Sequence, residues 1–268
     1  MNILVTIDSN YVMPLSVMLY SLMQSNPDKS FDIFVAHSSL TDSDFEKIRS
    51  AVDRTRTRIH SVTVPPELLC NAPVLKRITK ETYYRLLAID FLPQEVDKVL
   101  YIDPDTLIIN DITDFYNTDM SNSLITATSH VHGSLRSINL LRLGMPKSAE
   151  YINAGVMLMN LALMRKEITT SAIFEFIRRH SKTLFLGDQD VVNALYCKKT
   201  IVLDSVLFNC DEKTCRQNSL TVQQVRAKTS IIHYNGKYKP WNPDYKGILD
   251  EIWHEYAASL QRGNKNEV

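Results

Sequence analysis

The sequence contains little glycine, 7 residues in a chain of 268. None of the seven falls in a GxGxxG or a GxxxxGK[ST] pattern. These are the usual glycine-rich fingerprints that hold a dinucleotide or a triphosphate at a helix N-terminus. The sequence therefore argues against a Rossmann dehydrogenase and against a P-loop nucleotidase.

Cysteine is also scarce, and the four residues Cys70, Cys197, Cys210 and Cys215 form no C-x-x-C pair. A structural zinc site is therefore not expected. The first residues, MNILVTIDSNY, lack the basic start of a secretory leader and turn polar by Asp8. We expect a first strand there, reduced thiols and a cytoplasmic protein.

There is no excess of charge and no long apolar run. Lys+Arg 30 against Asp+Glu 30 gives a net charge of zero, so no nucleic-acid partner is expected. The longest apolar stretches, such as MPLSVMLYSLM (13–23), fall short of the roughly 20 residues that a membrane span needs. The tail carries a modest basic cluster, Arg262 and Lys265, and leaves peripheral contact with the inner face of a membrane open.

Runs rich in β-formers alternate with helical patterns. Strands are predicted at 3–7, 32–37, 58–64, 98–103, 123–130, 151–161 and 230–234, and helices at 14–25, 41–52, 80–92, 175–185, 190–199 and 245–261. Such alternation is typical of an α/β protein with a mostly parallel sheet flanked by helices. The irregular stretch 132–150 contains a short amphipathic piece and has the length of a lid or a binding loop.

The run VLYIDPDTLII (99–109) places Asp103 and Asp105 in a segment that is otherwise almost all apolar. Residues i and i+2 of a strand share a face, and Pro104 indicates that the strand ends there. Open parallel sheets bind ligands at the carboxyl ends of their strands, where two carboxylates suit Mn²⁺ or Mg²⁺. His233, after the strand SIIHY, is a candidate third ligand. The alternatives are a solvated surface turn and a core histidine.

Two further segments place polar groups at strand ends. In TIDSNY (6–11), Asp8 and Asn10 could bind a base edge and Tyr11 could stack on it, unless the segment is a simple turn. In HYNGKYKPW (233–241), Lys239 could face phosphate oxygens and Gly236 would let the backbone approach them; the alternative is a solvated lysine.

The segment GDQDVVN (187–193) contains a predicted helix start. Asp188 is a good N-cap, and Gln189 and Asp190 follow in the first turn. Ordinary capping explains Asp188 well. It explains Gln189 and Asp190 less well, so these two are candidates for a site.

Taken together, the segments resemble glycosyltransferase family 8, which includes glycogenin and bacterial galactosyl- and glucosyltransferases that modify cell-surface glycans. The six segments come in the family's order: TIDSNY, YYR (83–85), LYIDPDTLI, INAGVMLMNL, GDQDVVN and HYNGKYKPW. The resemblance implies a GT-A type nucleotide-sugar-binding fold, with a mostly parallel mixed sheet flanked by helices. It places the catalytic domain at 1–241 and a small C-terminal helical extension at 242–268.

The resemblance also implies a role for each matching residue. Asp103, Asp105 and His233 would hold the metal. The uridine would be bound by Thr6, Asp8, Asn10 and Tyr11, and the phosphates by Gly236 and Lys239. The donor sugar would be bound by Arg85, Asn153, Ala154, Asp188 and Gln189, with Gln189 beneath the anomeric carbon and Asp190 beside it. One departure stands out, because Ser129 and His130 occupy a place where the family often has aspartate.

By this resemblance, the protein is expected to be a metal-dependent retaining hexosyltransferase that uses UDP-glucose or UDP-galactose. The acceptor would be a glycan, a lipid-linked glycan or a glycoprotein. Gln189 is an amide and a poor nucleophile, which favours attack by the acceptor on the same face of the sugar. A covalent intermediate on Asp188 or Asp190 is the alternative mechanism.

Two other functions compete. A haloacid-dehalogenase-type phosphohydrolase also has D-x-D after an apolar strand, but it needs Thr or Val where this chain has Leu107. The second alternative is an inactive module that binds nucleotide sugars or glycans. Turnover of a UDP-sugar would separate it from an enzyme.

Overall fold

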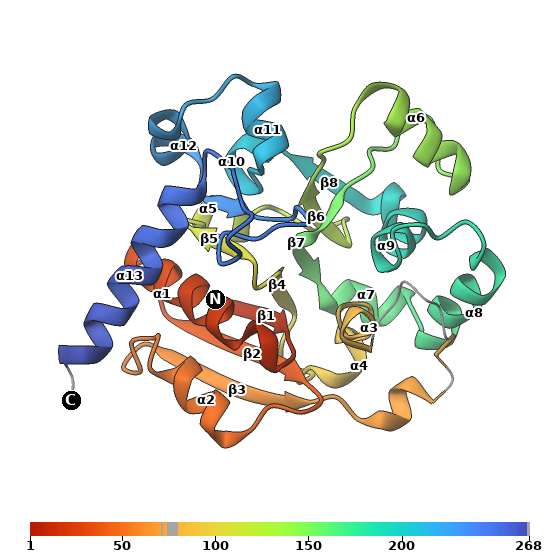
Figure 1. Cartoon of the computed structure of the whole chain (residues 1–268). Coiled ribbons are helices and arrows are strands. Elements are labelled where there is room, and N and C mark those ends of the chain that lie inside the picture. The colour runs from red at the N-terminus through yellow and green to blue at the C-terminus, as the bar shows by residue number, and fades with distance from the viewer. Residues whose placement is uncertain (71, 74–79, 267–268) are drawn as a thin grey trace.

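The computed structural model describes residues 1–70, 72–73 and 80–266 (Figure 1). Its central feature is a seven-stranded sheet with the order β3-β2-β1-β4-β7-β6-β8. The strands are β1 (Asn2–Thr6), β2 (Phe31–His37), β3 (Thr57–Thr63), β4 (Lys98–Ile102), β6 (Ile125–Thr128), β7 (Asn153–Asn160) and β8 (Thr200–Leu203). A two-stranded antiparallel sheet pairs β5 (Thr106–Ile108) with β9 (Ile231–His233).

The large sheet is mixed, with mostly parallel neighbours. β1 runs parallel to β2 and β4, β2 to β3, and β6 to β8. Only β7 breaks the pattern among the described strands, because it is antiparallel to both β4 and β6. The start of β7 therefore lies beside the end of β4, where the Asp103 amide donates to the Gly155 carbonyl at 2.7 Å. The predicted mixed sheet is confirmed.

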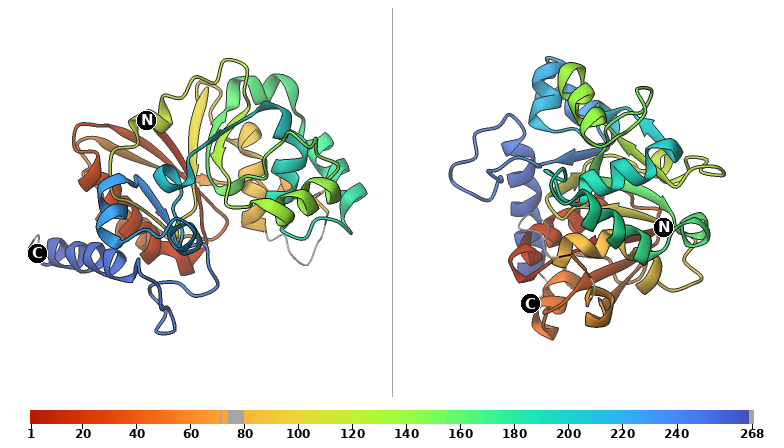
Figure 2. Two further views of the ribbon diagram at one scale, coloured as in Figure 1. Left: turned by 90° about the horizontal axis from the view of Figure 1, so that it is seen from above. Right: turned by 90° about the vertical axis from the view of Figure 1, so that its right-hand side faces the viewer.

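Helices cover both faces of the sheet, as the views in Figure 2 show. They are α1 (Val12–Ser25), α2 (Asp42–Arg49), α3 (Lys80–Leu86), α4 (Ala88–Phe91), α5 (Thr113–Tyr116), α6 (Gly133–Arg142), α7 (Leu161–Glu167), α8 (Thr170–His180), α9 (Asp188–Tyr196), α10 (Ser205–Phe208), α11 (Glu212–Gln217), α12 (Val222–Lys228) and α13 (Asp250–Asn266). The C-terminal helix α13 packs against α1 at one side of the molecule.

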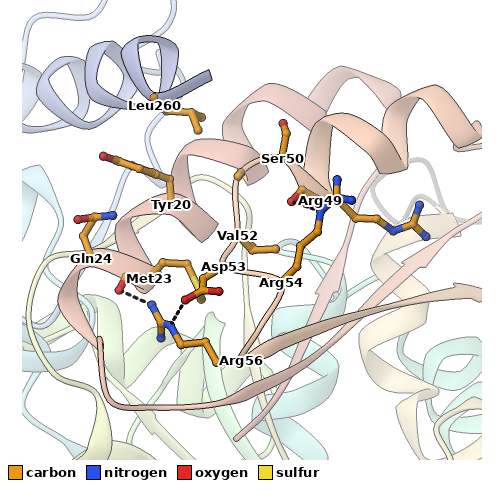
Figure 3. A pocket seen from close by; sticks show the side chains of 12 residues that line it. Tyr20, Met23, Gln24, Arg49, Ser50, Val52, Asp53, Arg54, Arg56 and Leu260 are labelled. Carbon is orange, nitrogen blue, oxygen red and sulfur yellow. Dashed lines mark hydrogen bonds and ion pairs between the residues drawn. The ribbon is translucent and has the colours of Figure 1, made fainter. Parts of the chain in front are cut away.

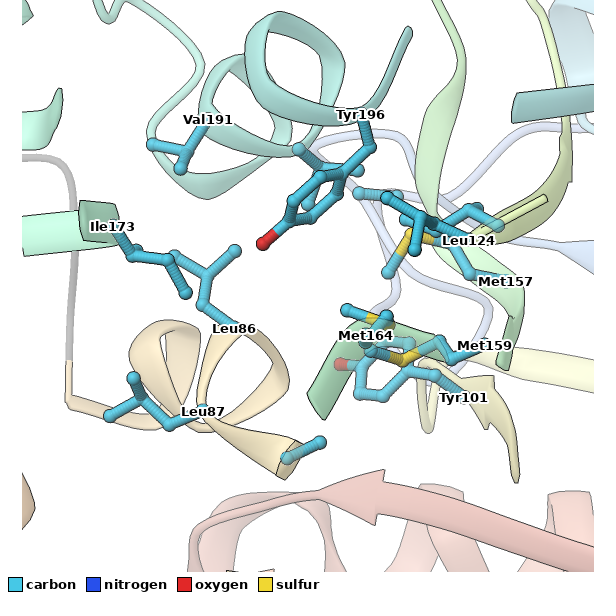
Figure 4. Packing of buried hydrophobic residues seen from close by; sticks show 14 of the residues in the cluster. Leu86, Leu87, Tyr101, Leu124, Met157, Met159, Met164, Ile173, Val191 and Tyr196 are labelled. Atoms are coloured by element: carbon cyan, nitrogen blue, oxygen red, sulfur yellow. The ribbon is translucent and has the colours of Figure 1, made fainter. Parts of the chain in front are cut away.

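The two faces of β4 show how the core is divided. Val99 and Tyr101 pack into the cluster beneath α3, α7, α8 and α9, whereas Leu100 and Ile102 face α1 and α2. This alternation follows from the two-residue repeat of a strand that is buried on both faces. In Figure 4, Met157 and Met159 of β7 extend the first cluster, and Tyr196 of α9 points its hydroxyl group into it.

Several predicted boundaries need correction. The run 99–109 is not one strand, because β4 ends at Ile102, the chain turns through Asp103, Pro104 and Asp105, and β5 joins the second sheet. The helix predicted at 80–92 is divided into α3 and α4, the helix predicted at 175–185 is α8, and the tail helix begins at Asp250. The piece predicted within 132–150 is α6.

The elements α5, α7, β8, α10, α11 and α12 were not predicted. The last three helices are short, so they show little hydrophobic periodicity. Each nevertheless has a capping signal in the sequence: Asp204, Asp211 and Thr221 accept hydrogen bonds from the first turns of α10, α11 and α12. Attention to capping residues would have found these three.

Candidate active site

An open cavity of about 250 Å³ lies at the carboxyl end of β4. It collects residues from five segments of the chain, and its lining is Arg85, Asp103, Asp105, Asn153, Ala154, Gly155, Leu186, Asp188, Gln189, His233 and Asn235. Most of these residues were predicted as site residues from the sequence. Leu186, Gly155 and Asn235 were not.

Asp103, Asp105 and His233 converge at the floor of this cavity. The register that pairs Thr106 with His233 across β5 and β9 brings the histidine beside the D-x-D turn. The His233 Nε2 atom lies 3.3 Å from Asp105 Oδ1 and 3.9 Å from Asp103 Oδ2. One ligand atom from each residue lies within 4.8 Å of the others, so the predicted convergence is found.

Hydrogen bonds fix which nitrogen of His233 carries the proton. Asn209 donates its amide to Asn153 Oδ1 at 3.1 Å, and Asn153 Oδ1 also accepts from the Gly155 amide at 3.0 Å. The Asn209 oxygen is therefore the atom that faces His233 Nδ1 at 2.9 Å, and His233 donates to it. This arrangement directs the Nδ1 proton to Asn209 and turns Nε2 toward the two carboxylates.

The floor of the cavity thus has an excess of acceptors. Asp105 Oδ1 is buried, and no hydrogen-bond donor reaches it from the described residues. A bare imidazole nitrogen and two carboxylates repel one another unless a proton or a cation lies between them. Two oxygen donors with one imidazole suit Mn²⁺ or Mg²⁺, and a histidine whose other nitrogen donates to a fixed oxygen is typical of metal ligation. The residues present therefore fit a divalent cation.

Gly155 leaves the space that this convergence needs. A Cβ atom at this position would lie 2.3 Å from His233 Cε1 and 2.6 Å from Asp103 Oδ2. Any side chain would push the histidine or the aspartate out of place. The sequence signal for this close approach was the glycine that follows Asn153 and Ala154 at the start of β7.

Lys239 is a positively charged residue that contacts the carboxylate of Asp105. Lys239 Nζ lies 2.6 Å from Asp105 Oδ2 and donates to the Tyr234 carbonyl at 2.7 Å. Burial by itself would raise the pKa of Asp105, but His233 and Lys239 outweigh it and hold that pKa below its usual range. Asp105 is therefore ionised at neutral pH, as a metal ligand must be.

Arg85 links the D-x-D turn to α9. Its guanidinium group lies 3.1 Å from Asp103 Oδ1 and 2.7 Å from Asp188 Oδ2, and it donates to the Ala154 carbonyl at 2.9 Å. Burial raises the pKa of Asp188 despite the arginine, with the Asp103 charge acting in the same direction. Arg85, Asp188 and Asp103 thus form a connected wall of the cavity.

Gln189 occupies the first turn of α9 and lines the cavity beside this wall. Its amide oxygen accepts from the Ala154 amide at 3.2 Å and from Asn153 Nδ2 at 3.3 Å, and its amide nitrogen donates to the Tyr151 hydroxyl at 3.3 Å. These contacts fix the side chain against β7. The predicted Asn153–Ala154 strip and Gln189 are therefore brought together.

Asp190 is not brought into the cavity. It is fully buried, and Arg142 holds it with two bonds of 2.7 and 2.8 Å. The Tyr151 hydroxyl and the Leu186 amide donate to it at 2.6 and 2.8 Å. Because all its oxygens are engaged away from the cavity, this geometry gives Asp190 a positioning role and disfavours it as a nucleophile. The sequence reading missed its partners Arg142 and Tyr151.

The predicted uridine segment lies beside the metal-ligand cluster without lining the cavity. Thr6 Oγ1 meets the Tyr101 hydroxyl at 3.1 Å, and that hydroxyl donates to Asp103 Oδ1 at 2.5 Å. The pKa of Tyr11 is raised by partial burial and by the nearby charges of Asp105 and Asp103.

The remaining predicted nucleotide contacts are at the surface. Asp8 accepts from the Asn10 amide at 2.9 Å and so serves as a local cap, as the simpler interpretation of this turn expected. Gly236 is exposed near Lys239, and the ring edge of Tyr11 meets Trp241 at a centroid distance of 6.1 Å.

Ser129 and His130 are buried behind the cavity. Ser129 donates to the Tyr151 carbonyl at 2.8 Å, and His130 Nε2 donates to the Asn209 carbonyl at 2.6 Å. Burial lowers the pKa of His130, although Asp211 at 3.5 Å opposes the shift. At these two positions the chain therefore has side chains that each donate a hydrogen bond to a backbone carbonyl group.

A larger cavity, of about 570 Å³, lies elsewhere, between α1, the α2–β3 turn and α13 (Figure 3). Its arginines are already engaged: Arg49 and Arg54 pair with Glu46, and Arg56 pairs with Asp53 and donates to the Met23 carbonyl. Its described lining residues include no group of acceptors comparable with the metal-ligand cluster. We therefore place the chemistry in the smaller cavity.

A mixed sheet with a D-x-D turn at the end of a central strand, facing the start of an antiparallel strand, matches the GT-A glycosyltransferase fold that the sequence resembles. The chain belongs to glycosyl transferase family 8, whose sequence model matches residues 2–244. Family membership leaves the phosphohydrolase alternative without support.

Relatives and solved structures agree with this assignment. General stress protein A of Bacillus subtilis is 24% identical over 95% of this chain and 92% of its own length. Lipopolysaccharide 1,3-galactosyltransferase of Salmonella typhimurium is 25% identical over 90% of this chain and 73% of its own. The crystal structure of the galactosyltransferase LgtC, in complex with donor and acceptor sugar analogs, superposes with a TM-score of 0.84. It is 25% identical and covers 97% of this chain and 96% of its own.

Proposed function

We propose that the protein is a metal-dependent retaining hexosyltransferase that moves glucose or galactose from a UDP-sugar to a hydroxyl group of a glycan acceptor. The observation that carries the proposal is the acceptor-rich cluster of Asp103, Asp105 and His233, set beside Arg85, Asp188 and Gln189 in one cavity. The lipopolysaccharide galactosyltransferase among the relatives supports a hexose donor and a cell-surface glycan acceptor.

The leaving group in this reaction is a diphosphate. Bound by Asp103, Asp105 and His233, Mn²⁺ or Mg²⁺ would act as a Lewis acid on the departing phosphate oxygens. Lys239 and Arg85 add fixed positive charges on two sides of the same space. Gly236 and Lys239 are assigned to the phosphates, and Thr6, Asp8, Asn10 and Tyr11 to the uridine.

The residues near the sugar favour attack by the acceptor on the face from which the diphosphate leaves. Gln189 presents a neutral amide, which is a poor nucleophile but can stabilise developing positive charge. Asp188 is engaged by Arg85 at 2.7 Å, and Asp190 lies outside the cavity lining. A departing phosphate oxygen would accept the proton of the acceptor hydroxyl.

The test is turnover of UDP-glucose and UDP-galactose in the absence of acceptor, measured as the release of UDP. We expect hydrolysis that EDTA abolishes and Mn²⁺ restores. Full turnover in chelator would overturn the metal assignment, and no turnover of any UDP-sugar would favour a binding module that has lost activity. We place the protein in the cytoplasm, with residues 1–241 as the catalytic part and 242–268 as its helical extension.

A further inference from the structure

Exposed apolar side chains gather on α6 and in the loop before α9, whose Leu186 lines the cavity. Five of the nine large hydrophobic residues that stand exposed in the described chain lie on α6 or in the loop before α9. They are Leu135, Ile138, Leu141, Phe185 and Leu186, and we name this set the apolar rim. Their exposed fractions range from 52% for Phe185 to 85% for Leu141.

Helix α6 exposes most of its apolar residues, whereas a helix packed on a core buries them. Leu135, Ile138 and Leu141 follow a three-residue spacing, which places them on one side of the helix, and all three are exposed. Leu140 is the residue that α6 buries against the protein. An outward apolar stripe of this kind marks an interaction surface.

The loop before α9 adjoins α6 and is held in place. The Arg142 guanidinium lies over the Phe185 ring at 4.8 Å and donates to the Thr183 carbonyl. The same guanidinium binds Asp190, which in turn accepts from the Leu186 amide at 2.8 Å. The network around Asp190 therefore fixes the two parts of the apolar rim relative to each other. Figure 1 shows α6 and α9 on the same side of the molecule.

The apolar rim is continuous with the cavity, because Leu186 belongs to both. Whatever covers the rim therefore lies next to the cavity. Binding there would orient the open side of the cavity toward the covering surface.

Acids balance three of the arginines around the rim. Arg136 pairs with Glu150, Arg142 with Asp190, and Arg179 with Glu175. The other basic residues in the two segments 132–150 and 176–187 are Lys147, Arg178 and Lys182. Lys147 and Lys182 are exposed. An apolar stripe flanked by basic residues is complementary to an anionic lipid surface.

We propose that the apolar rim docks on an anionic phospholipid bilayer. Leu135, Ile138, Leu141 and Phe185 would enter the headgroup boundary, and Lys147 and Lys182 would face lipid phosphates. The cavity would then open toward the membrane, within reach of an acceptor carried by a lipid. A second copy of the chain fits less well, because a two-fold interface would place the same basic groups opposite each other.

Sedimentation with vesicles tests this proposal on the full chain. We expect binding to vesicles of phosphatidylethanolamine and phosphatidylglycerol, little binding to phosphatidylcholine vesicles, and weakening by salt. The double variant Ile138→Ser and Leu141→Ser should lower the partition coefficient about tenfold or more, since each substitution removes a side chain that the lipid would bury. Lys147→Glu with Lys182→Glu should lower it by a similar factor.

Matched controls are available on another exposed segment. Ile248→Ser and Lys246→Glu change the same residue types outside the rim and should bind as the wild type does. The substituted positions are exposed, so circular dichroism should be unchanged, and UDP-sugar hydrolysis without vesicles should also be unchanged. This second readout separates failure of membrane docking from failure of the proposed enzymatic function.

Three results would overturn the proposal. The first is a wild-type protein that binds anionic and neutral vesicles equally or not at all. The second is rim variants that bind as well as the wild type, which would place the lipid contact elsewhere, for instance on α13. The third is a concentration-dependent dimer that the Ile138→Ser and Leu141→Ser variant abolishes, which would assign the rim to a second copy of the chain.

Discussion

Two buried acidic clusters lie close together in this molecule, and they differ in the balance of donors and acceptors. Around Asp190, Arg142, Tyr151 and the Leu186 amide supply a donor for each carboxylate oxygen. Around Asp105, the Nε2 atom of His233 faces Oδ1 at 3.3 Å, and among the described residues only Lys239 donates to the other oxygen.

The comparison shows that burial of a carboxylate does not by itself mark an active site. A buried charge with a full set of donors holds the fold together. A cluster with more acceptors than donors needs a cation from outside, and it is the better candidate for function. The predictions below aim at this contrast, from the largest expected effect to the smallest.

Asp105→Asn should nearly abolish catalysis and spare the fold. A metal that acts as a Lewis acid contributes several kcal/mol, so we expect kcat for UDP-sugar hydrolysis to fall about a thousandfold. The melting temperature should fall less than in Asp190→Asn, because the loss of the pair with Lys239 is offset in part by the removal of repulsion within the cluster. Asp111→Asn, an exposed control, should keep full activity. Retained turnover in the Asp105 variant would remove the metal-ligand cluster from the mechanism.

Asp190→Asn should destabilise the fold and largely spare catalysis. Breaking a buried ion pair leaves Arg142 without its partner and costs about 3–5 kcal/mol in the free energy of unfolding, measured in urea. The control is Glu150→Gln, which breaks the more exposed pair with Arg136 and should cost less than about 1 kcal/mol. A stable but inactive Asp190→Asn protein would instead indicate a direct chemical role for this carboxylate.

Gln189→Ala tests whether the amide acts on the transition state. Loss of one preorganised dipole should lower kcat by roughly 10²–10³. If Gln189 only fills a helical turn, the change should be a few tenths of a kcal/mol in stability. In Gln189→Glu, an accumulated glycosyl-enzyme would support same-face attack in the wild type. A glycosyl adduct on Asp188 or Asp190 of the wild type would contradict it.

Asn209 was not predicted from the sequence, and it should act through His233. Asn209→Leu should weaken Mn²⁺ binding about 10–100-fold, as is usual when the partner of a metal-bound histidine is removed. Asn209→Asp keeps an oxygen for His233 Nδ1 and should recover most of the affinity. Nitrogen NMR of the metal-free protein should show Nδ1 protonated in the wild type. A purely structural role would leave the tautomer unchanged in Asn209→Leu.

The smallest effect concerns pH. Burial lowers the pKa of His130 in the fold, so the neutral ring is favoured there. Its contribution to stability is present above the unfolded pKa of about 6.5 and is lost as the pH falls through the folded pKa. The free energy of unfolding, measured in urea, should therefore fall as the pH is lowered from 7 to 5. In His130→Gln the slope of this free energy against pH should be smaller. An equal slope in both proteins would assign it to other groups.

The alternation of apolar runs was enough to predict a mostly parallel sheet and its main helices, whereas the mixed character of the sheet was predicted from the family resemblance. Strands such as β1 and β4 have a continuous apolar pattern that follows from burial on both faces. What the pattern could not show was where β5 goes. The residues Thr106–Ile108 are as apolar as β4, and only the turn at Pro104 and the pairing with β9 move them to a second sheet.

The site was predictable where a residue type carries the chemistry, and less so where hydrogen bonds assign the role. Asp103, Asp105 and His233 were found because carboxylates and imidazole at strand ends favour a cation. Asp188 and Asp190 look alike in the sequence, but one faces the cavity and the other faces Arg142. That difference arises from the turn at Gly187, with φ of 60°, and from the direction of the first turn of α9.

Calorimetric titration with Mn²⁺ tests the central claim most directly. In the presence of UDP, the wild-type protein should bind one Mn²⁺ ion per chain, and Asp105→Asn should not bind at the same concentrations. Asp190→Asn, kept below its melting temperature, should bind as the wild type does. Mn²⁺ binding that persists in Asp105→Asn, or that disappears in a folded Asp190→Asn protein, would contradict the assignment of these two clusters.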